Sequence, residues 1–407
     1  MCAAIDSEAL RPPSDQALLV RFLGNWRSRF ASLSDTLPRE KMQMPETRDK
    51  HPFFLYDAIQ SQPDLIDQVF AKQRTKIEDA AGAAAGKKRF VFIGIGTSLN
   101  AANVCERWMR FHSGGRASAR AEQSFEFVHY PLALGPEDVA IVITHTGTTT
   151  KSIEALRAAK AAGAMTIAVT GQKSGDGIQG ADFHIETCEQ ELAFAYTKSY
   201  TTALAALAKF ILAILEPRGL VKDAIGADAA LEKVPSLMRL ALRSEIKIRE
   251  IAKQVAPKQR LIFFGSGTGW ATAVEAALKN KETSYIAAEG FETEELLHGP
   301  FSEIDSRGAI VAMLTGEPAD DRARTILRAA GELGMLRVAV TVPDANRDIA
   351  AEHVIVLPEM AAWLEPFIHL VPLQLLTYYI AVARGVNADS GRQDQEAHAR
   401  AHKVYKL

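Results

Sequence analysis

An internal repeat constrains the fold of this 407-residue chain more than any other feature of its sequence. Residues 89–98 (RFVFIGIGTS) align without a gap on residues 260–269 (RLIFFGSGTG), about 170 positions further on. This offset is the length of a whole domain, since solenoid and propeller units repeat every ~20–50 residues. Two more strand-like segments repeat at a similar offset: residues 140–144 match 309–313, and residues 166–170 match 337–341. The sequence therefore predicts two copies of one domain.

Each copy is predicted to be an α/β domain. From about residue 88 onward, short apolar runs alternate with Ala-rich helical stretches, which is the pattern of a parallel sheet flanked by helices in three layers. Helical spacing of apolar residues also predicts a helix within 15–34 and another from Phe53 to Phe70. The predicted parts are a helical extension and linker over 1–50, a first domain over 51–225, a second domain over 235–385 and a C-terminal tail over 386–407.

Composition and charge limit the classes of function. A formal net charge of −2 and a pI near 6.6 give no reason to expect a nucleic-acid partner. No apolar run approaches the ~20 residues that span a bilayer, and residues 1–11 lack the apolar core of a signal peptide, so we expect a cytoplasmic protein without membrane contact. Cys2, Cys105 and Cys188 are too few and too scattered for a disulfide framework or a zinc site, and no metal or organic cofactor is expected.

A glycine-rich loop follows the first strand of each copy. In the first copy, Gly94-Ile-Gly96 opens a predicted helix, as a nucleotide-binding turn does. Leu99 stands where a dinucleotide fingerprint needs its third glycine, and Trp270 takes that place in the second copy, so a Rossmann cofactor site is disfavoured. A tight turn from strand to helix explains the second loop well. The first loop also offers two hydroxyl groups at the helix N-terminus, those of Thr97 and Ser98.

Residues 144–152 (THTGTTTKS) are the sharpest motif of the first copy. Hydroxyl groups crowd the start of a predicted helix, where backbone N–H groups and the helix dipole favour an anion, so we predict a site for a phosphate-like group. The alternative is that one threonine merely caps the helix, although a cap needs only one hydroxyl. The second copy reads TGEPADD over 315–321, which is acidic and would repel a phosphate. Anion binding is therefore expected in the first copy alone.

The second copy carries acid–base groups instead. Glu275, Lys279 and Glu282 share one face of a helix predicted over 271–284, and His298 follows in a His-Gly-Pro turn. A solvated Glu–Lys pair is the alternative reading of the helix, since such pairs are common. A carboxylate, an ammonium and an imidazole near an anchored sugar can open its ring, move a proton between C1 and C2 and stabilise the enediolate. Together these groups indicate aldose–ketose isomerisation.

In combination, these motifs resemble the sugar isomerase (SIS) domain family, and more closely the tandem isomerase half of glucosamine-6-phosphate synthase and its relatives without a glutaminase domain. The resemblance covers about residues 51–395, beginning with HPFFLYDAIQSQP over 51–63 and including Glu191 with Thr197-Lys198. It implies a homodimer whose site is completed across subunits and whose substrate is an anionic sugar. The implied substrate-binding residues are Gly96, Thr97, Ser98, Thr144, His145, Thr146, Thr149, Tyr196, Glu275 and Arg392.

The resemblance also implies catalytic roles. Glu282 would move the C1/C2 proton with Lys279 beside it, and His298 would open the ring from the partner subunit. Lys403 is the candidate for a tail lysine that forms a Schiff base with the open-chain ketose, although Gln393 to His402 intervene after Arg392. The expected function is a sugar-phosphate aldose–ketose isomerase or an amino-sugar-6-phosphate deaminase/isomerase.

Three departures from the family pattern leave alternatives open. Threonines replace the usual serines at 144 and 146, His145 replaces a glutamine, and Tyr196 replaces a small hydroxyl residue. An isomerase of another anionic sugar, such as a sulfonated one, and a non-catalytic sugar-phosphate-binding regulator therefore remain alternatives. Cys2 stands where a glutaminase nucleophile would stand, but only about fifty residues precede the first α/β copy, so no glutaminase activity is expected.

Overall fold

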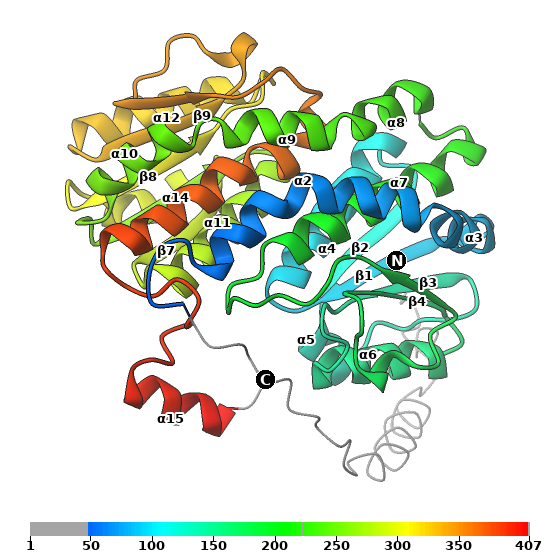
Figure 1. Cartoon of the computed structure of the whole chain (residues 1–407). Helices are drawn as coiled ribbons and strands as arrows, with labels where there is room; N and C mark the ends of the chain where they lie inside the picture. The colour runs from blue at the N-terminus through cyan, green and yellow to red at the C-terminus, as the bar shows by residue number, and fades with distance from the viewer. Residues whose placement is uncertain (1–47, 222, 406–407) are drawn as a thin grey trace, which may run out of the picture. The chain divides into compact units, whose positions relative to one another are not determined.

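The computed structural model describes residues 48–221 and 223–405. Cys2 and the helix predicted within 15–34 lie outside these residues. The chain forms two five-stranded sheets in which every strand pairing is parallel (Figure 1). The predicted α/β fold of two sheet domains is thereby confirmed.

The two sheets have the same topology. The first has the order β2-β1-β3-β4-β5, and the second has the equivalent order β7-β6-β8-β9-β10. The strands of the first sheet are β1 (Arg89–Gly94), β2 (Ser118–Gln123), β3 (Asp138–Ile143), β4 (Met165–Thr170) and β5 (Phe183–Glu186). Those of the second sheet are β6 (Arg260–Gly265), β7 (Ala287–Glu292), β8 (Gly308–Met313), β9 (Leu336–Thr341) and β10 (His353–Val356).

The strand register corrects one part of the predicted repeat. Arg89 pairs with Asp138 in the first sheet, and its counterpart Arg260 pairs with Gly308 in the second. Ala309 is therefore equivalent to Val139, so the alignment that matched residues 140–144 with 309–313 was wrong by one position. Both strands are buried along their whole length, and a strand that is apolar on both faces has no alternation to fix its register.

Helices cover both sheets, and several of them join the two domains. The helix predicted from Phe53 to Phe70 is α2 (Phe54–Lys72), and the one predicted over 271–284 is α11 (Thr268–Thr283). The other helices of the first domain are α3 (Arg74–Ala84), α4 (Thr97–Ser113), α5 (Ser124–His129), α6 (Thr150–Ala161) and α7 (Lys198–Leu215). They are followed by α8 (Ala224–Glu232), α9 (Val234–Leu242), α10 (Glu245–Val255), α12 (Asp320–Glu332), α13 (Glu365–Ile368), α14 (Leu370–Ala383) and α15 (Glu396–Tyr405).

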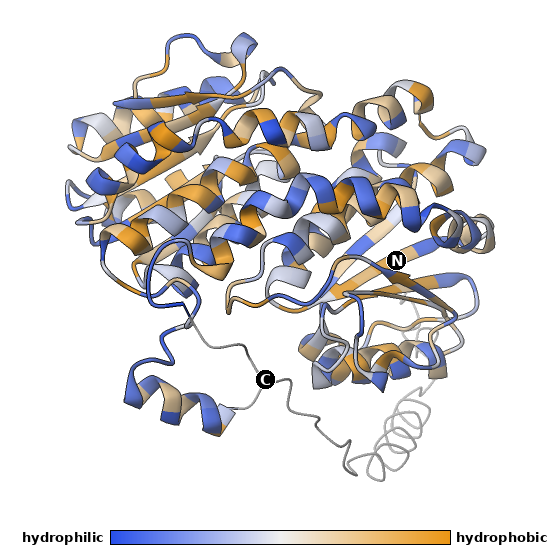
Figure 2. Cartoon of the chain, viewed as in Figure 1, coloured by the Kyte–Doolittle hydropathy of each residue, from blue (hydrophilic) through white to orange (hydrophobic). Residues whose placement is uncertain are grey.

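One hydrophobic core runs through both domains. It includes Phe90 of β1 and Phe263 of β6, and the strands and central helices are correspondingly apolar in Figure 2. Trp108 of α4 stacks on Phe367 of α13 and donates a hydrogen bond of 2.8 Å to the carbonyl of Trp363. Burial of such large aromatic side chains is among the strongest contributions to packing. Helix α4 is thus held firmly against the second domain, which positions the site described below.

Two helical segments are long and apolar enough to cross a membrane, Lys198–Arg218 and Ala362–Ala383. The prediction that no apolar run approaches that length was therefore wrong. In the most apolar window of each segment, 83% and 89% of the residues are buried inside the protein. Burial of this kind is typical of core helices, so these segments are weak evidence for a membrane span.

Candidate functional site

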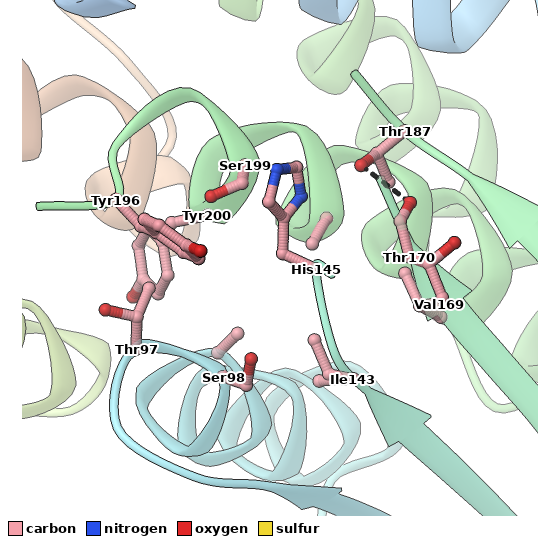
Figure 3. A pocket seen from close by; sticks show the side chains of 12 residues that line it. Thr97, Ser98, Ile143, His145, Val169, Thr170, Thr187, Tyr196, Ser199 and Tyr200 are labelled. Carbon is pink, nitrogen blue, oxygen red and sulfur yellow. Dashed lines mark hydrogen bonds between the residues drawn. The ribbon is translucent and has the colours of Figure 1, made fainter. Parts of the chain in front are cut away.

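A pocket lies at the carboxyl ends of the strands of the first sheet. In the order 2-1-3-4-5, the connections leave the sheet in opposite directions at β1 and β3, and ligands of open α/β sheets bind at that point. The pocket is lined by four of the predicted residues, Thr97, Ser98, His145 and Tyr196 (Figure 3). The structure therefore brings together groups from three separate sequence segments.

Two glycines allow α4 to begin directly after β1. A Cβ atom on Gly94 would lie 2.4 Å from the carbonyl carbon of Ser98, so only glycine permits this close approach of helix to strand. Gly96 has a φ of +58°, a conformation that other residues rarely adopt. Close helix–strand packing thus comes from Gly94 rather than from the third glycine of a dinucleotide fingerprint. The turn presents Thr97 and Ser98 to the pocket.

The loop after β3 supplies unpartnered polar groups. Thr144 is buried, and its hydroxyl has no hydrogen-bond partner in the described part of the chain. Thr149 occupies the N-cap position of α6, but its side chain makes no capping hydrogen bond within residues 48–221 and 223–405. The alternative of an ordinary threonine cap is therefore wrong for Thr149.

Thr146 contributes to the loop rather than to the pocket lining. Its hydroxyl accepts hydrogen bonds from the backbone N–H and the hydroxyl of Thr148, at 3.2 and 2.8 Å. Its carbonyl accepts a hydrogen bond from the N–H of Gly175. These bonds fix the turn that presents Thr144 and His145.

The His145 side chain is neutral and closely packed between its neighbours. It is 9% exposed, and burial, followed by the positive charge of Lys198, lowers its pKa to about 4. A Cβ on Gly171 would lie 2.4 Å from the ring carbon Cε1, and the ring of Tyr196 meets the imidazole edge-on at 5.3 Å. Neither ring nitrogen has a partner among the described residues. The imidazole can therefore offer one N–H donor to a ligand.

The predicted acid–base residues of α11 reach the same pocket through Thr97. The Lys279 ammonium donates a hydrogen bond of 2.9 Å to the Thr97 hydroxyl, which donates one of 3.2 Å to Glu275. Asn100 of α4 donates a second hydrogen bond to Glu275, at 2.7 Å. Lys279 also pairs with Glu282 at 2.5 Å. Helices from the two domains thus form one polar network, and sequence alone did not suggest the role of Asn100.

Glu275 and Lys279 are buried, at 0% and 1% exposure, so the alternative of a solvated ion pair is wrong. Burial raises the pKa of Glu275, although Lys279 and the hydrogen bond from Asn100 oppose it. Burial also acts to lower the pKa of Lys279, but the carboxylates of Glu275 and Glu282 outweigh it and raise that pKa. Lys279 therefore stays charged, while the Glu282 side chain is 21% exposed and remains accessible.

Three predicted residues, His298, Arg392 and Lys403, belong neither to the pocket lining nor to the hydrogen-bonded network of α11. His298 lies between the short helices η3 (Glu295–Leu297) and η4 (Pro300–Glu303), where its side chain is 68% exposed and 3.4 Å from Glu294. Arg392 lies over the ring of Tyr285, 5.1 Å from its centroid. Lys403 is exposed on α15. Their roles in catalysis and binding remain predictions.

The second domain fills the equivalent loop with its own carboxylate. Asp320 begins α12 as Thr150 begins α6, is 4% exposed, and accepts a hydrogen bond of 2.8 Å from the N–H of Gly316. At the start of α11, Glu365 accepts a hydrogen bond from Thr272, and burial raises the pKa of Glu365 to about 8. The two copies have therefore diverged in the way their acidic and hydroxyl loops suggested.

Several pocket residues were not predicted from the sequence, and two of them carry hydroxyl groups at the start of α7. Ser199 and Tyr200, in the first turn of α7, line the pocket beside Tyr196 (Figure 3). The signal that could have found them is their place directly after the Thr197-Lys198 motif. They were missed because the helix that follows is nearly all apolar and reads as core.

Comparison with known proteins agrees with this architecture. The family model for the SIS domain matches residues 85–213 and 254–384. The chain is 29% identical over 346 residues to a glutamine–fructose-6-phosphate aminotransferase [isomerizing] of Thermococcus kodakarensis, covering 84% of this chain and 57% of the relative. A Haemophilus ducreyi protein of the same name is 31% identical over 321 residues, covering 77% and 52%. The chain thus spans a little over half the length of these relatives.

Solved structures share the fold. The C-terminal domain of glucosamine-fructose-6-phosphate aminotransferase from Francisella tularensis has a TM-score of 0.77 and 24% identity, covering 84% of this chain and 99% of that one. A tagatose-6-phosphate ketose/aldose isomerase from Escherichia coli has a TM-score of 0.69 and 21% identity, covering 84% and 95%. The two family matches cover the two sheets described above. The chain therefore belongs to the SIS domain family and contains two tandem SIS domains.

Proposed function

We propose that this protein interconverts the aldose and ketose forms of a sugar phosphate, or couples that step to deamination of an amino-sugar 6-phosphate. One observation carries the proposal. The hydroxyl-rich pocket of the first domain is joined, through Thr97, to Glu275 and Lys279 on α11 of the second domain. A phosphate in the pocket would hold the sugar within reach of Glu282, the accessible carboxylate of that network.

The proposed chemistry is a proton transfer along the sugar chain. Ser98, Thr144 and His145 donate hydrogen bonds to the phosphate group. Glu282 removes the proton from C2 of the open-chain aldose, and the resulting enediolate is stabilised by the Lys279 ammonium. Glu282 then returns the proton to C1 while the hydroxyl proton moves from O2 to O1, which gives the ketose. Atoms and charge balance without a metal or an organic cofactor.

Ring opening is proposed to need a second copy of the chain. His298 is exposed and lies outside the pocket lining, so we assign it to the pocket of a neighbouring subunit in a homodimer, with the sugar ring oxygen as its partner. The names of the relatives support the reaction class. They describe isomerizing aminotransferases and a ketose/aldose isomerase, and a glucosamine-6-phosphate deaminase of Thermotoga maritima shares the fold at a TM-score of 0.66.

Turnover assays on purified protein test the proposal. If the protein is a deaminase, glucosamine 6-phosphate and water are expected to yield fructose 6-phosphate and ammonia. If it is an isomerase alone, ketose and aldose 6-phosphates are expected to interconvert without ammonia. Sulfonated sugars are assayed in parallel, because His145 departs from the family pattern. Tight binding of a sugar phosphate with no turnover of any substrate would contradict the proposal and favour a regulator.

A further inference from the structure

The Tyr200 hydroxyl is buried in the pocket wall and forms no hydrogen bond with the described residues of the chain. Tyr200 is 2% exposed and lines the pocket, and its hydroxyl has no hydrogen-bond partner within residues 48–221 and 223–405. Buried polar groups in proteins are nearly always paired, because an unpaired one loses its bonds to water and gains nothing. A phenylalanine would fill the same space without this cost. The hydroxyl therefore points to a ligand.

The first turn of α7 leaves the hydroxyl groups of Ser199 and Tyr200 without a partner among the described residues. Helix N-termini expose backbone N–H groups that nearby side chains usually cap. Here the buried carboxylate of Glu191 accepts hydrogen bonds from the N–H groups of Thr197 and Ser199, at 2.8 and 2.9 Å. Neither Ser199 nor Tyr200 is needed as a cap, and both side chains line the pocket.

The surroundings of Tyr200 make its hydroxyl a donor. Burial, followed by the charges of Glu275 and Glu365, raises the pKa of Tyr200 well above the ordinary value, so the phenol keeps its proton. In Figure 3, Tyr200 lies with Tyr196 and Thr97 on one side of the pocket. Thr97 is the residue that contacts Lys279 and Glu275. Tyr200 thus lies on the side of the pocket that faces α11.

We propose that Tyr200 is a specificity-determining residue whose hydroxyl donates a hydrogen bond to a hydroxyl or carbonyl oxygen of the sugar chain. The inference rests on the proposed function, since it places a sugar between the anion-binding loop and α11. Tyr200 recognises the carbon chain, whereas Ser98, Thr144 and His145 recognise the anion. The substrate class is therefore a polyhydroxylated chain carrying an anionic group, and the anion alone does not engage Tyr200.

The test compares two probes on Tyr200→Phe, which keeps the ring and removes the hydroxyl. The affinity for inorganic phosphate depends on the anion-binding groups alone. The affinity for fructose 6-phosphate depends on those groups and also on the residues that contact the sugar chain. The affinity for fructose 6-phosphate should fall about tenfold, the weight of one neutral hydrogen bond, while the affinity for inorganic phosphate is unchanged. The melting temperature without ligand should rise, because an unpaired buried hydroxyl is gone. Tyr130→Phe is the matched control, since Tyr130 is 77% exposed and does not line the pocket.

Several results would overturn the inference. An unchanged affinity for fructose 6-phosphate, or an equal loss for both probes, would remove Tyr200 from recognition of the sugar chain. A lower melting temperature in Tyr200→Phe would mean that the hydroxyl stabilises the fold. If the wild-type protein bound neither probe, the proposed function would fail and this inference with it. Wild-type binding with an unaffected Tyr200→Phe variant would overturn the inference alone.

Discussion

Replacing Glu282 by glutamine is expected to lower kcat for sugar-phosphate isomerisation by about 10²–10⁴-fold, with little change in KM. The factor is the usual contribution of a positioned general base, and glutamine cannot accept the proton from C2. KM should stay nearly unchanged, because the phosphate of the substrate is bound by residues of the first domain that the substitution does not alter. Steady-state kinetics of the purified variant, with the substrate identified by the turnover assays, measure both quantities.

Glu289→Gln is the matched control for that variant, because Glu289 is an exposed carboxylate of the same domain. It should leave kcat and KM unchanged. Full activity in Glu282→Gln would remove Glu282 from proton transfer and with it the proposed mechanism. A large rise in KM at unchanged kcat would instead make Glu282 a substrate-binding residue.

Replacing Lys279 by methionine is expected to destabilise the fold by about 3–5 kcal/mol, the usual cost of removing one partner from a buried ion pair. Lys279 is 1% exposed and lies 3.5 Å from Glu275, which is fully buried. Without the ammonium, Glu275 must carry an unpaired charge in the interior or take up a proton. Equilibrium unfolding in denaturant measures the loss in the free energy of unfolding.

A second substitution separates this cause from a packing defect. The double variant Lys279→Met/Glu275→Gln lacks both the ammonium and the carboxylate of the buried pair. Because no unpaired charge is left in the interior, its free energy of unfolding should recover a large part of the loss seen in Lys279→Met. Lys281→Met is the control, because Lys281 is exposed on the same helix and its replacement should change stability by no more than about 0.5 kcal/mol. A double variant no more stable than Lys279→Met would contradict the electrostatic account.

The fold could be predicted from the sequence because its strongest signal was a repeat. Duplicated strands and glycine turns give two parallel α/β domains without any knowledge of how the domains pack. The register of β3 against β8 could not be settled in the same way, since both strands are apolar on every face. Only the hydrogen-bonded pairing in the sheets fixes which residues are equivalent.

The separate motifs of the candidate site could be predicted from the sequence, but the way in which they come together could not. The 144–152 loop and the α11 stripe are local clusters that stand out in the sequence. The hydrogen bonds of Thr97 with Glu275 and Lys279 join residues about 180 positions apart, and they depend on α4 packing against α11. No local pattern encodes that contact. Tyr200 was missed for a related reason, because an aromatic residue at the start of an apolar helix is usually core.

The central claim is that one site combines the anion-binding loop of the first domain with the acid–base groups of the second. A crystal structure of the Glu282→Gln variant with fructose 6-phosphate tests it most directly. The phosphate should lie within hydrogen-bond distance of Ser98, Thr144 and His145, with C1 or C2 about 3–3.5 Å from the side chain at position 282. A phosphate bound at the 314–320 loop of the second domain, or a sugar chain directed away from α11, would contradict the claim.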